Sequence, residues 1–375
     1  MTPFPRPVYA PLEPYAPDRR AVEVDLSDNT NRWGAHPGAL EVVRSADPEE
    51  LLRYPPVYAD RLKAAIARRY GVPEEAVATG CGSDDLLDSA FRAAGEAGDG
   101  VAFVPPTFSM VEIFARMNAL EARPVLGEPP ASTSEPALGA LPSPEELVAA
   151  AAGEDPGTPG SGSGGGGLVY ICRPNNPTGE LQPRAWVEAI IQEGEARGDR
   201  APVILLDEAY ADYAPDNFLE VAVRSRRVLV VRTLSKLFGL AGLRVGFAVG
   251  SPEVIREVEK SRGPYKVNRL AEAAAVAALE DAEGWIPGIR SETLEGRARL
   301  AFELASRGYT PLPSSANFIL VPVDDAVFVT ASLRQEGVAV RPFPELPGLG
   351  DAIRISVGPP AELDRFLKAL DRVYG

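Results

Sequence analysis

The feature that most constrains the fold is a succession of short apolar runs separated by helix-forming stretches. Continuous apolar runs occur at Leu168–Cys172, Val203–Leu206 and Val228–Val231, and a helical pattern at Trp186–Ala196 lies between the first two. Strands that are apolar at every position are covered on both faces, and strands that alternate with helices form parallel sheets. The sequence therefore predicts an α/β fold, with a mainly parallel sheet sandwiched by helices.

Shorter elements extend this pattern toward the N-terminus. Apolar runs at Ala76–Thr79 and Val101–Val104 predict two more strands. Apolar residues at helical spacing predict helices over Glu49–Tyr70, Leu86–Ala94 and Met110–Ala119. These elements belong to the same sheet and its covering helices.

Composition divides the chain into three parts. Residues 1–35 are rich in proline and lack a core face, so we expect an extended arm that packs near the smaller domain. Residues 36–262 form the large, ligand-binding domain. Shorter alternating strands and longer helices then predict a second, smaller α+β domain over 263–375. The glycine- and serine-rich segment 156–167 is expected to be a solvent-exposed loop.

The second domain has its own predicted elements. They are helices at Leu270–Glu280, Ser291–Ser306 and Ala361–Tyr374, and strands at Phe318–Val321, Val338–Arg341 and Ile353–Val357. The prediction is a small sheet with helices of its own.

Charge and residue counts exclude several classes of function. The net charge of −15 opposes a nucleic-acid partner, because phosphate backbones bind basic surfaces. A single histidine, His36, and two widely separated cysteines, Cys81 and Cys172, leave no zinc cluster, histidine triad or redox pair. Because no run is long and apolar enough for a signal peptide or membrane helix, we expect a cytoplasmic protein with no membrane partner.

The stretch Thr233–Gly246 carries the strongest chemical signal. It places Lys236 directly after Ser235 and upstream of Arg244 in a glycine-rich segment. A lysine amine forms a Schiff base with an aldehyde, while a hydroxyl and a guanidinium can hold a phosphate. This combination predicts a site for pyridoxal phosphate; a surface lysine in a glycine-containing loop is the alternative for this stretch alone.

The ends of two predicted strands supply partners for the ring of this cofactor. Ligands of open α/β sheets lie at the carboxyl ends of the strands. Asp207 follows one strand and can keep the pyridine nitrogen protonated, which makes the ring an electron sink. Tyr210 and Asn176 can both hydrogen-bond the phenolic oxygen of the cofactor.

Two further features suit the same cofactor. Ser83 and Asp84 open a predicted helix whose free N–H groups favour a phosphate. Phe108, which follows a pair of prolines, offers a ring to stack on the pyridine. Each feature alone is common in turns and cores, whereas the ordered set is not.

These residues lie in motifs that resemble those of the fold-type I pyridoxal-phosphate aminotransferases, and of their histidinol-phosphate aminotransferase-like branch. The resemblance runs from Leu26 to Val357. The matching motifs are Gly82–Asp85, Pro106–Met110, Pro174–Gly179, Asp207–Tyr210, Thr233–Lys236, Gly239–Arg244, Pro264–Asn268 and Ile353–Gly358. The resemblance implies a transaminase that uses a small-molecule amino donor and a 2-oxo acid acceptor.

The resemblance also assigns roles to residues. It implies that Lys236 bonds to the cofactor and moves the proton, and that Thr233 belongs to the cofactor-binding set. Tyr54 would reach the cofactor phosphate of a neighbouring subunit, which implies a homodimer with shared active sites. Arg354 would bind a substrate carboxylate, and Arg341 would add a cation for a phosphate ester.

Three positions depart from the family pattern. Phe108 stands where the branch has tyrosine, Lys266 where it has asparagine, and Trp33 where it has tyrosine in the wall of the substrate pocket. An indole adds apolar area and would suit an aromatic amino acid as well as an imidazole. Substrate choice therefore remains open at Trp33, Arg341 and Arg354.

The resulting prediction is transamination between histidinol phosphate and 2-oxoglutarate, a step of histidine biosynthesis. The alternatives are an aromatic amino-acid aminotransferase and a pyridoxal-phosphate-dependent decarboxylase of the threonine-phosphate type. A pyridoxal-binding regulator would need a basic DNA-binding domain, for which the chain has neither the charge nor the length.

Overall fold

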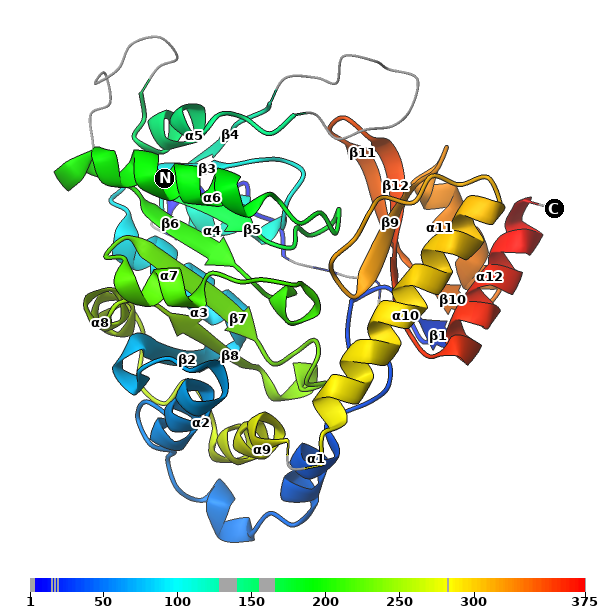
Figure 1. The fold of residues 1–375 in the computed structure, drawn as a ribbon, viewed down its shortest axis with the longest axis horizontal. Helices are drawn as coiled ribbons and strands as arrows, with labels where there is room; N and C mark the ends of the chain where they lie inside the picture. The colour runs from blue at the N-terminus through cyan, green and yellow to red at the C-terminus, as the bar shows by residue number, and fades with distance from the viewer. Residues whose placement is uncertain are drawn as a thin grey trace.

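A mainly parallel sheet forms the centre of the larger part of the molecule (Figure 1). The computed structural model describes residues 4–14, 16, 18, 20–127, 140–154, 166–281 and 283–374. Within these residues the sheet has seven strands in the order β2-β8-β7-β6-β5-β3-β4. Strand β8 runs antiparallel to both β2 and β7, and the other pairs are parallel. The predicted α/β class is confirmed.

The strands of this sheet are short. They are β2 (Val77–Cys81), β3 (Gly100–Phe103), β4 (Glu121–Pro124), β5 (Leu168–Cys172), β6 (Val203–Asp207), β7 (Val228–Thr233) and β8 (Val245–Val249). Successive residues of a strand face opposite sides. Thus Val169 and Ile171 enter one core cluster, while Tyr170 and Cys172 enter the other. The sheet has a separate apolar core on each face.

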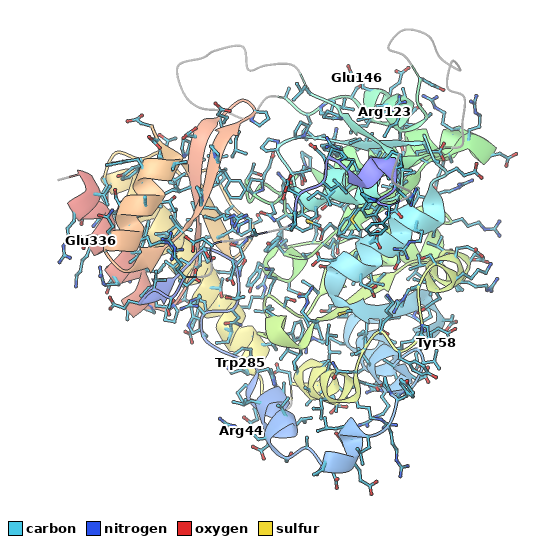
Figure 2. All side chains as sticks on the ribbon, turned by 180° about the vertical axis from the view of Figure 1, so that it is seen from behind. Arg44, Tyr58, Arg123, Glu146, Trp285 and Glu336 are labelled. Carbon is cyan, nitrogen blue, oxygen red and sulfur yellow. The ribbon has the colours of Figure 1, made fainter. Side chains whose placement is uncertain are left out.

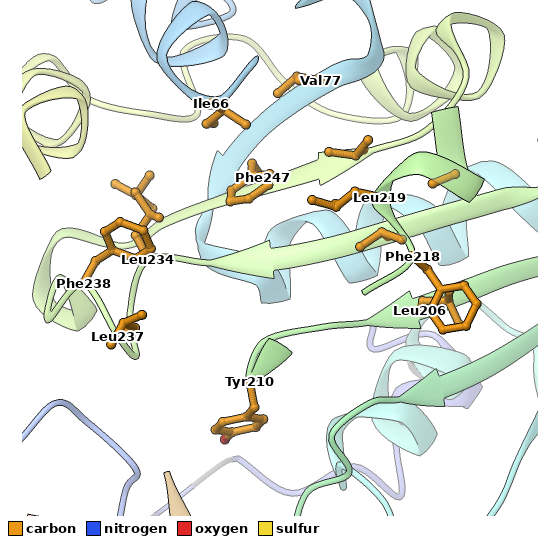
Figure 3. Packing of buried hydrophobic residues seen from close by; sticks show 14 of the residues in the cluster. Ile66, Val77, Leu206, Tyr210, Phe218, Leu219, Leu234, Leu237, Phe238 and Phe247 are labelled. Atoms are coloured by element: carbon orange, nitrogen blue, oxygen red, sulfur yellow. The ribbon is translucent and has the colours of Figure 1, made fainter. Parts of the chain in front are cut away.

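Helices cover both faces, and their apolar sides build the two cores. One core packs under α3 (Gly82–Ala94), α4 (Met110–Met117) and α8 (Pro252–Lys260). The other packs under α2 (Asp60–Tyr70), α5 (Pro144–Ala151), α6 (Arg184–Ala196), α7 (Leu219–Arg224) and α9 (Arg269–Glu280), with α1 (Pro37–Arg44) against α9. Figure 3 shows part of this second core.

A small antiparallel sheet lies at the other end of the molecule (Figure 1). It has the order β11-β12-β9, formed by β9 (Phe318–Pro322), β11 (Arg341–Leu346) and β12 (Gly350–Ser356). The helices α10 (Trp285–Ser306), α11 (Ala326–Gln335) and α12 (Pro360–Tyr374) accompany it. Their apolar residues form a third core.

The N-terminal arm contacts both parts of the molecule. The 3-10 helix η1 (Pro7–Tyr9) contacts α4, one of the helices that cover the large sheet. Strand β1 (Val24–Asp25) then pairs in parallel with β10 (Val338–Ala339) beside the small sheet. The arm therefore passes from one domain to the other.

Two predicted elements differ from the structure. Val338–Arg341 was predicted as one strand, but β10 pairs with the arm while β11, from Arg341, joins the antiparallel sheet. The predicted helix Glu49–Tyr70 divides into the 3-10 helix η2 (Pro48–Leu51) and α2, because Pro55 and Pro56 interrupt it.

The predicted domain boundaries stay predictions. Helix α9 falls in the range 263–375 that was predicted to form the small domain, and it packs against α1 and α2 of the large domain. Most of the predicted loop 156–167 lies outside the described residues. Over the part of the chain that the structure describes, no helix combines the length and apolarity required to span a bilayer.

Candidate active site

A cavity of about 620 Å³ lies at the carboxyl ends of β5, β6 and β7, with the small antiparallel sheet and the arm as its other walls. Every predicted cofactor-binding residue except Tyr54 lines it, and so do Arg341 and Arg354. Residues separated by hundreds of positions thus meet at one sheet edge, where ligands of α/β sheets bind. The volume is in the range of small-molecule sites.

Lys236, the predicted nucleophile, lines this cavity. It follows β7 and is partly buried, and its Nζ donates to the backbone oxygen of Asp28 in the arm (3.3 Å). Burial, followed by repulsion from Arg354, lowers the pKa of Lys236 to about 8. Since the neutral amine attacks an aldehyde, this environment prepares Lys236 for covalent chemistry near neutral pH.

Asp207 ends β6 and is 4% exposed. Burial raises the pKa of its carboxyl to about 6, although hydrogen bonds from the Tyr170 hydroxyl (2.8 Å) and the Ala209 N–H (3.0 Å) act in the opposite direction. A cationic ring nitrogen would pair with such a carboxylate. Tyr170 was not predicted to belong to the site, because a tyrosine within an apolar strand is usually a core residue.

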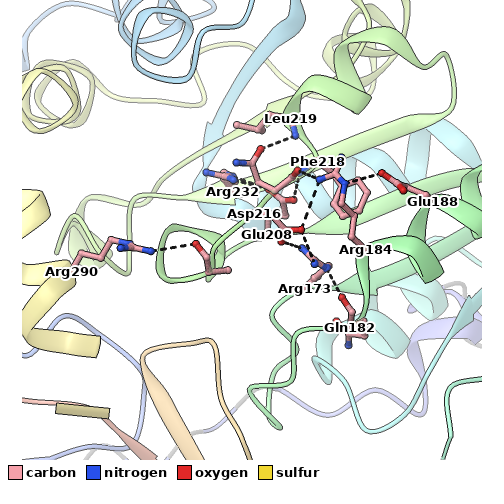
Figure 4. Close-up of polar contacts among 12 residues, drawn as sticks. Arg173, Gln182, Arg184, Glu188, Glu208, Asp216, Phe218, Leu219, Arg232 and Arg290 are labelled. Atoms are coloured by element: carbon pink, nitrogen blue, oxygen red, sulfur yellow. Dashed lines mark hydrogen bonds and ion pairs between the residues drawn. The ribbon is translucent and has the colours of Figure 1, made fainter. Parts of the chain in front are cut away.

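Glu208, next in the chain, is anchored on the other side of the sheet. Its side chain forms a buried ion pair with Arg232 (2.7 Å) and accepts the Phe218 N–H (2.7 Å). Figure 4 shows this network beside the ion pair of Arg173 with Asp216. These contacts hold Glu208 on the side of the sheet away from the cavity. They therefore fix the turn from which Asp207 points into the cavity.

Tyr210 receives a hydrogen bond from the arm. Its hydroxyl accepts from Nδ2 of Asn29 (3.0 Å), and burial raises the pKa of the phenol well above its ordinary value, so the hydroxyl keeps its proton. The ring projects from the end of β6 (Figure 3). Asn29 has a positive φ of 58° and also accepts from the Ser356 hydroxyl (3.1 Å). The contact between Asn29 and Tyr210 was not predicted from the sequence.

The first turn of α3 forms a cradle that fits a phosphate. Gly82 has a φ of +80°, and a Cβ there would lie 2.4 Å from Nη2 of Arg244. Arg244 therefore crosses directly over the start of the helix, where it also pairs with Asp84 (3.2 Å). The hydroxyls of Thr233 and Ser235, 2.8 Å apart, line the same cavity. Free helix N–H groups, hydroxyls and a guanidinium are the donors that bind phosphate.

Two arginines face the cavity from the small sheet. Arg341 and Arg354 are opposed residues of β11 and β12. Arg354 donates to Oδ1 of Asn176 and to the backbone oxygen of Ser27 (2.9 Å), and its guanidinium lies over the ring of Phe343. Asn176 is thus held by the residue predicted to bind the substrate.

Three residues discussed from the sequence lie outside the cavity lining, namely Tyr54, Trp33 and Lys266. Tyr54 is 77% exposed and stacks on Tyr265, with ring centroids 4.7 Å apart. Trp33 packs against the cores of both domains, and the structure does not place it in the pocket wall. Lys266 donates to Asp85 (2.9 Å) at the start of α3.

Comparisons with known proteins identify the family of this chain. The family model for aminotransferase class I and II matches residues 21–370. A histidinol-phosphate aminotransferase from Aromatoleum aromaticum is 34% identical over 367 residues, with 96% of each chain covered. An aromatic amino acid aminotransferase from Thermobifida fusca is 34% identical over 378 residues, covering 97% of this chain and 96% of the relative.

Solved structures are similar as well. The histidinol-phosphate aminotransferase from Sinorhizobium meliloti, in complex with pyridoxal-5'-phosphate, has a TM-score of 0.77 at 26% identity, covering 94% of this chain and 91% of that one. The predicted resemblance to the fold-type I pyridoxal-phosphate aminotransferases is confirmed. The chain belongs to the aminotransferase class I and II family.

Proposed function

We propose that this aminotransferase exchanges an amino group between histidinol phosphate and 2-oxoglutarate, with pyridoxal phosphate bound at Lys236. The observation that carries the proposal is the pair Arg341 and Arg354 in the wall of the Lys236 cavity. A phosphate ester and a dicarboxylate both carry two negative charges, whereas an aromatic amino acid carries one carboxylate. Two guanidinium groups therefore suit the phosphorylated donor and the dicarboxylate acceptor.

The residues of the site have separate tasks. The cofactor, when bound, supplies an aldehyde and an electron-withdrawing ring. Lys236 as a neutral amine holds and moves the proton at the substrate Cα. Asp207 keeps the ring nitrogen protonated, and Tyr210 and Asn176 orient the ring through its phenolic oxygen. The start of α3 and Arg244 hold the phosphate.

Exposed apolar residues on the large domain support a homodimer with shared sites. They are Leu40, Val43, Leu51, Leu52, Tyr54, Val57, Tyr58 and Tyr265, each more than a third exposed. Figure 2 places Tyr58 at the end of the molecule remote from the small sheet. Exposed apolar side chains of this kind favour contact with a second copy, whose Tyr54 would reach this cavity. We place the enzyme in the cytoplasm, in histidine biosynthesis.

A second candidate is transamination of aromatic amino acids. It is favoured by the Thermobifida fusca relative, and by Phe108 and Phe343 in the cavity lining. In that case Arg354 binds the carboxylate and the two rings contact the aromatic side chain.

A panel of amino donors separates the two candidates. Purified enzyme receives histidinol phosphate, tyrosine or phenylalanine with 2-oxoglutarate, and the glutamate formed is measured. We expect the highest kcat/KM with histidinol phosphate. A higher value with either aromatic amino acid would transfer the assignment to the second candidate. Carbon dioxide released from threonine phosphate in a parallel assay, with no glutamate formed, would indicate a decarboxylase.

A further inference from the structure

We propose that Tyr170 is a positioning residue that acts on the cofactor through Asp207: its hydroxyl holds the carboxylate ionised and aimed at the cofactor's ring nitrogen. The inference rests on the proposed function, because it takes Asp207 as the partner of that nitrogen. Tyr170 does not line the cavity, so any effect on the cofactor must be indirect.

The register of the sheet brings the two side chains together. In the parallel pair β5–β6, Tyr170 lies opposite Leu205 and Cys172 lies opposite Asp207. Residues two positions apart in a strand share a face, so Tyr170 and Asp207 project from the same side. The length of the tyrosine side chain spans the offset along the strand, and its hydroxyl reaches Oδ2 of Asp207 at 2.8 Å.

This contact fixes one end of the carboxylate while the backbone fixes the other. Oδ1 of Asp207 accepts the Ala209 N–H (3.0 Å), and Oδ2 accepts the Tyr170 hydroxyl. Both carboxylate oxygens are therefore held, and each keeps lone pairs for a further donor. The side-chain bond is shielded from water, since Tyr170 is 1% exposed.

Hydrogen bonds to a charged carboxylate favour that form, which matters here because burial opposes it. The other groups that face Asp207 are Asp84 from α3, which raises the pKa of Asp207, and Lys236, which lowers it. Cys172 shares the strand face, and burial raises the pKa of its thiol, so it stays neutral. Burial also raises the pKa of Tyr170, which therefore remains a donor.

The test is cofactor binding by the apoprotein, followed by protein fluorescence across a pH series. For Tyr170→Phe we expect about tenfold weaker binding of pyridoxal phosphate, the usual effect of losing a hydrogen bond to a charged group. The pH below which affinity falls should also move upward, because the carboxylate loses a donor that favours its ionised form. Tyr70→Phe is the matched control: Tyr70 contacts Asp212 (3.3 Å) outside the cavity and should leave both quantities unchanged.

A double-mutant cycle separates positioning from packing. If Tyr170 acts through Asp207, Tyr170→Phe should have no further effect on affinity in an Asp207→Asn background. An equal loss in both backgrounds, or a wild-type affinity and pH dependence in Tyr170→Phe, would overturn the inference. The cycle remains decisive even if the single variant melts at a lower temperature. If the wild type binds the cofactor but transfers no amino group, the proposed function fails independently.

Discussion

Arg341 and Arg354 lie directly opposite each other on β11 and β12, and both line the cavity that contains Lys236. Like charges opposed on neighbouring strands destabilise a sheet. An anion that contacts both groups relieves this repulsion, so the pair is better suited to a substrate with two negative charges than to one with a single carboxylate.

Arg341→Ala should therefore discriminate between substrates. We expect kcat/KM for histidinol phosphate to fall by about 10- to 100-fold, as for loss of a charge-assisted hydrogen bond, and the value for tyrosine to fall much less. Steady-state kinetics with both donors measures the difference. Arg299→Ala, a surface arginine on α10 that pairs with Asp364, serves as the control. Equal losses with the two donors would remove the basis for favouring the phosphate ester.

Lys236→Ala should abolish cofactor attachment and activity together. The side chain is the amine in the cavity that reaches toward the arm and lies over the Tyr210 ring at 5.6 Å. The visible absorbance of the bound cofactor and the formation of glutamate are the two measurements. A variant with turnover comparable to the wild type would show that another group carries the chemistry.

The rate of cofactor attachment should depend on pH through Lys236. The neutral amine reacts, and the pKa of Lys236 is lowered to about 8, so the rate should rise with pH and level off above that value. Arg354→Gln removes a repulsion that lowers this pKa and should move the midpoint upward. Stopped-flow mixing of apoprotein with pyridoxal phosphate gives the profile. An unchanged midpoint in Arg354→Gln would mean that burial alone sets it.

Gly82→Ala should weaken the binding of pyridoxal phosphate, in addition to lowering the stability of the folded protein. The added methyl group would lie 2.4 Å from Arg244, which must move away from the phosphate cradle. Gly71 is a matched control, because it also has a positive φ (66°) but no atom within 4 Å of the position that a Cβ would occupy. Both variants should lose about 1–2 kcal/mol of stability from the left-handed backbone, while only Gly82→Ala loses affinity for pyridoxal phosphate. Calorimetry of the apoproteins and cofactor titration separate the two effects.

Shared active sites predict complementation between inactive or weakened subunits. A mixture of Lys236→Ala and Tyr54→Ala proteins forms heterodimers in which one site has both native residues. Activity at limiting cofactor should therefore exceed the sum of the two separate proteins. No gain after subunit exchange, verified by mass measurement of the heterodimer, would place Tyr54 outside the partner's site.

The sheet and the cofactor cavity could be predicted because their signals are local. Apolar runs identified β5, β6 and β7, and the rule that ligands bind at strand ends then brought Asp207, Asn176 and Lys236 together. These residues were found from their order in the chain and from the family resemblance.

Contacts between residues that are far apart in the sequence could not be predicted in the same way. Tyr170 reads as a core residue until the β5–β6 register shows that it reaches Asp207. Asn29 meets Tyr210 only because the arm crosses the cavity. The division of Val338–Arg341 between two sheets has the same origin, since alternation of residues specifies faces but not partners.

The path of the arm has a mechanical consequence. Leu26 accepts the Ser356 N–H (2.9 Å) from the small sheet, while Asn31 donates to the backbone oxygen of Leu237 (2.8 Å), which directly follows Lys236. Leu26 and Asn31 are five residues apart, and an extended chain spans at most about 3.5 Å per residue. The arm therefore sets an upper limit on how far the small sheet, with Arg354 on it, can move away from the loop that holds the lysine.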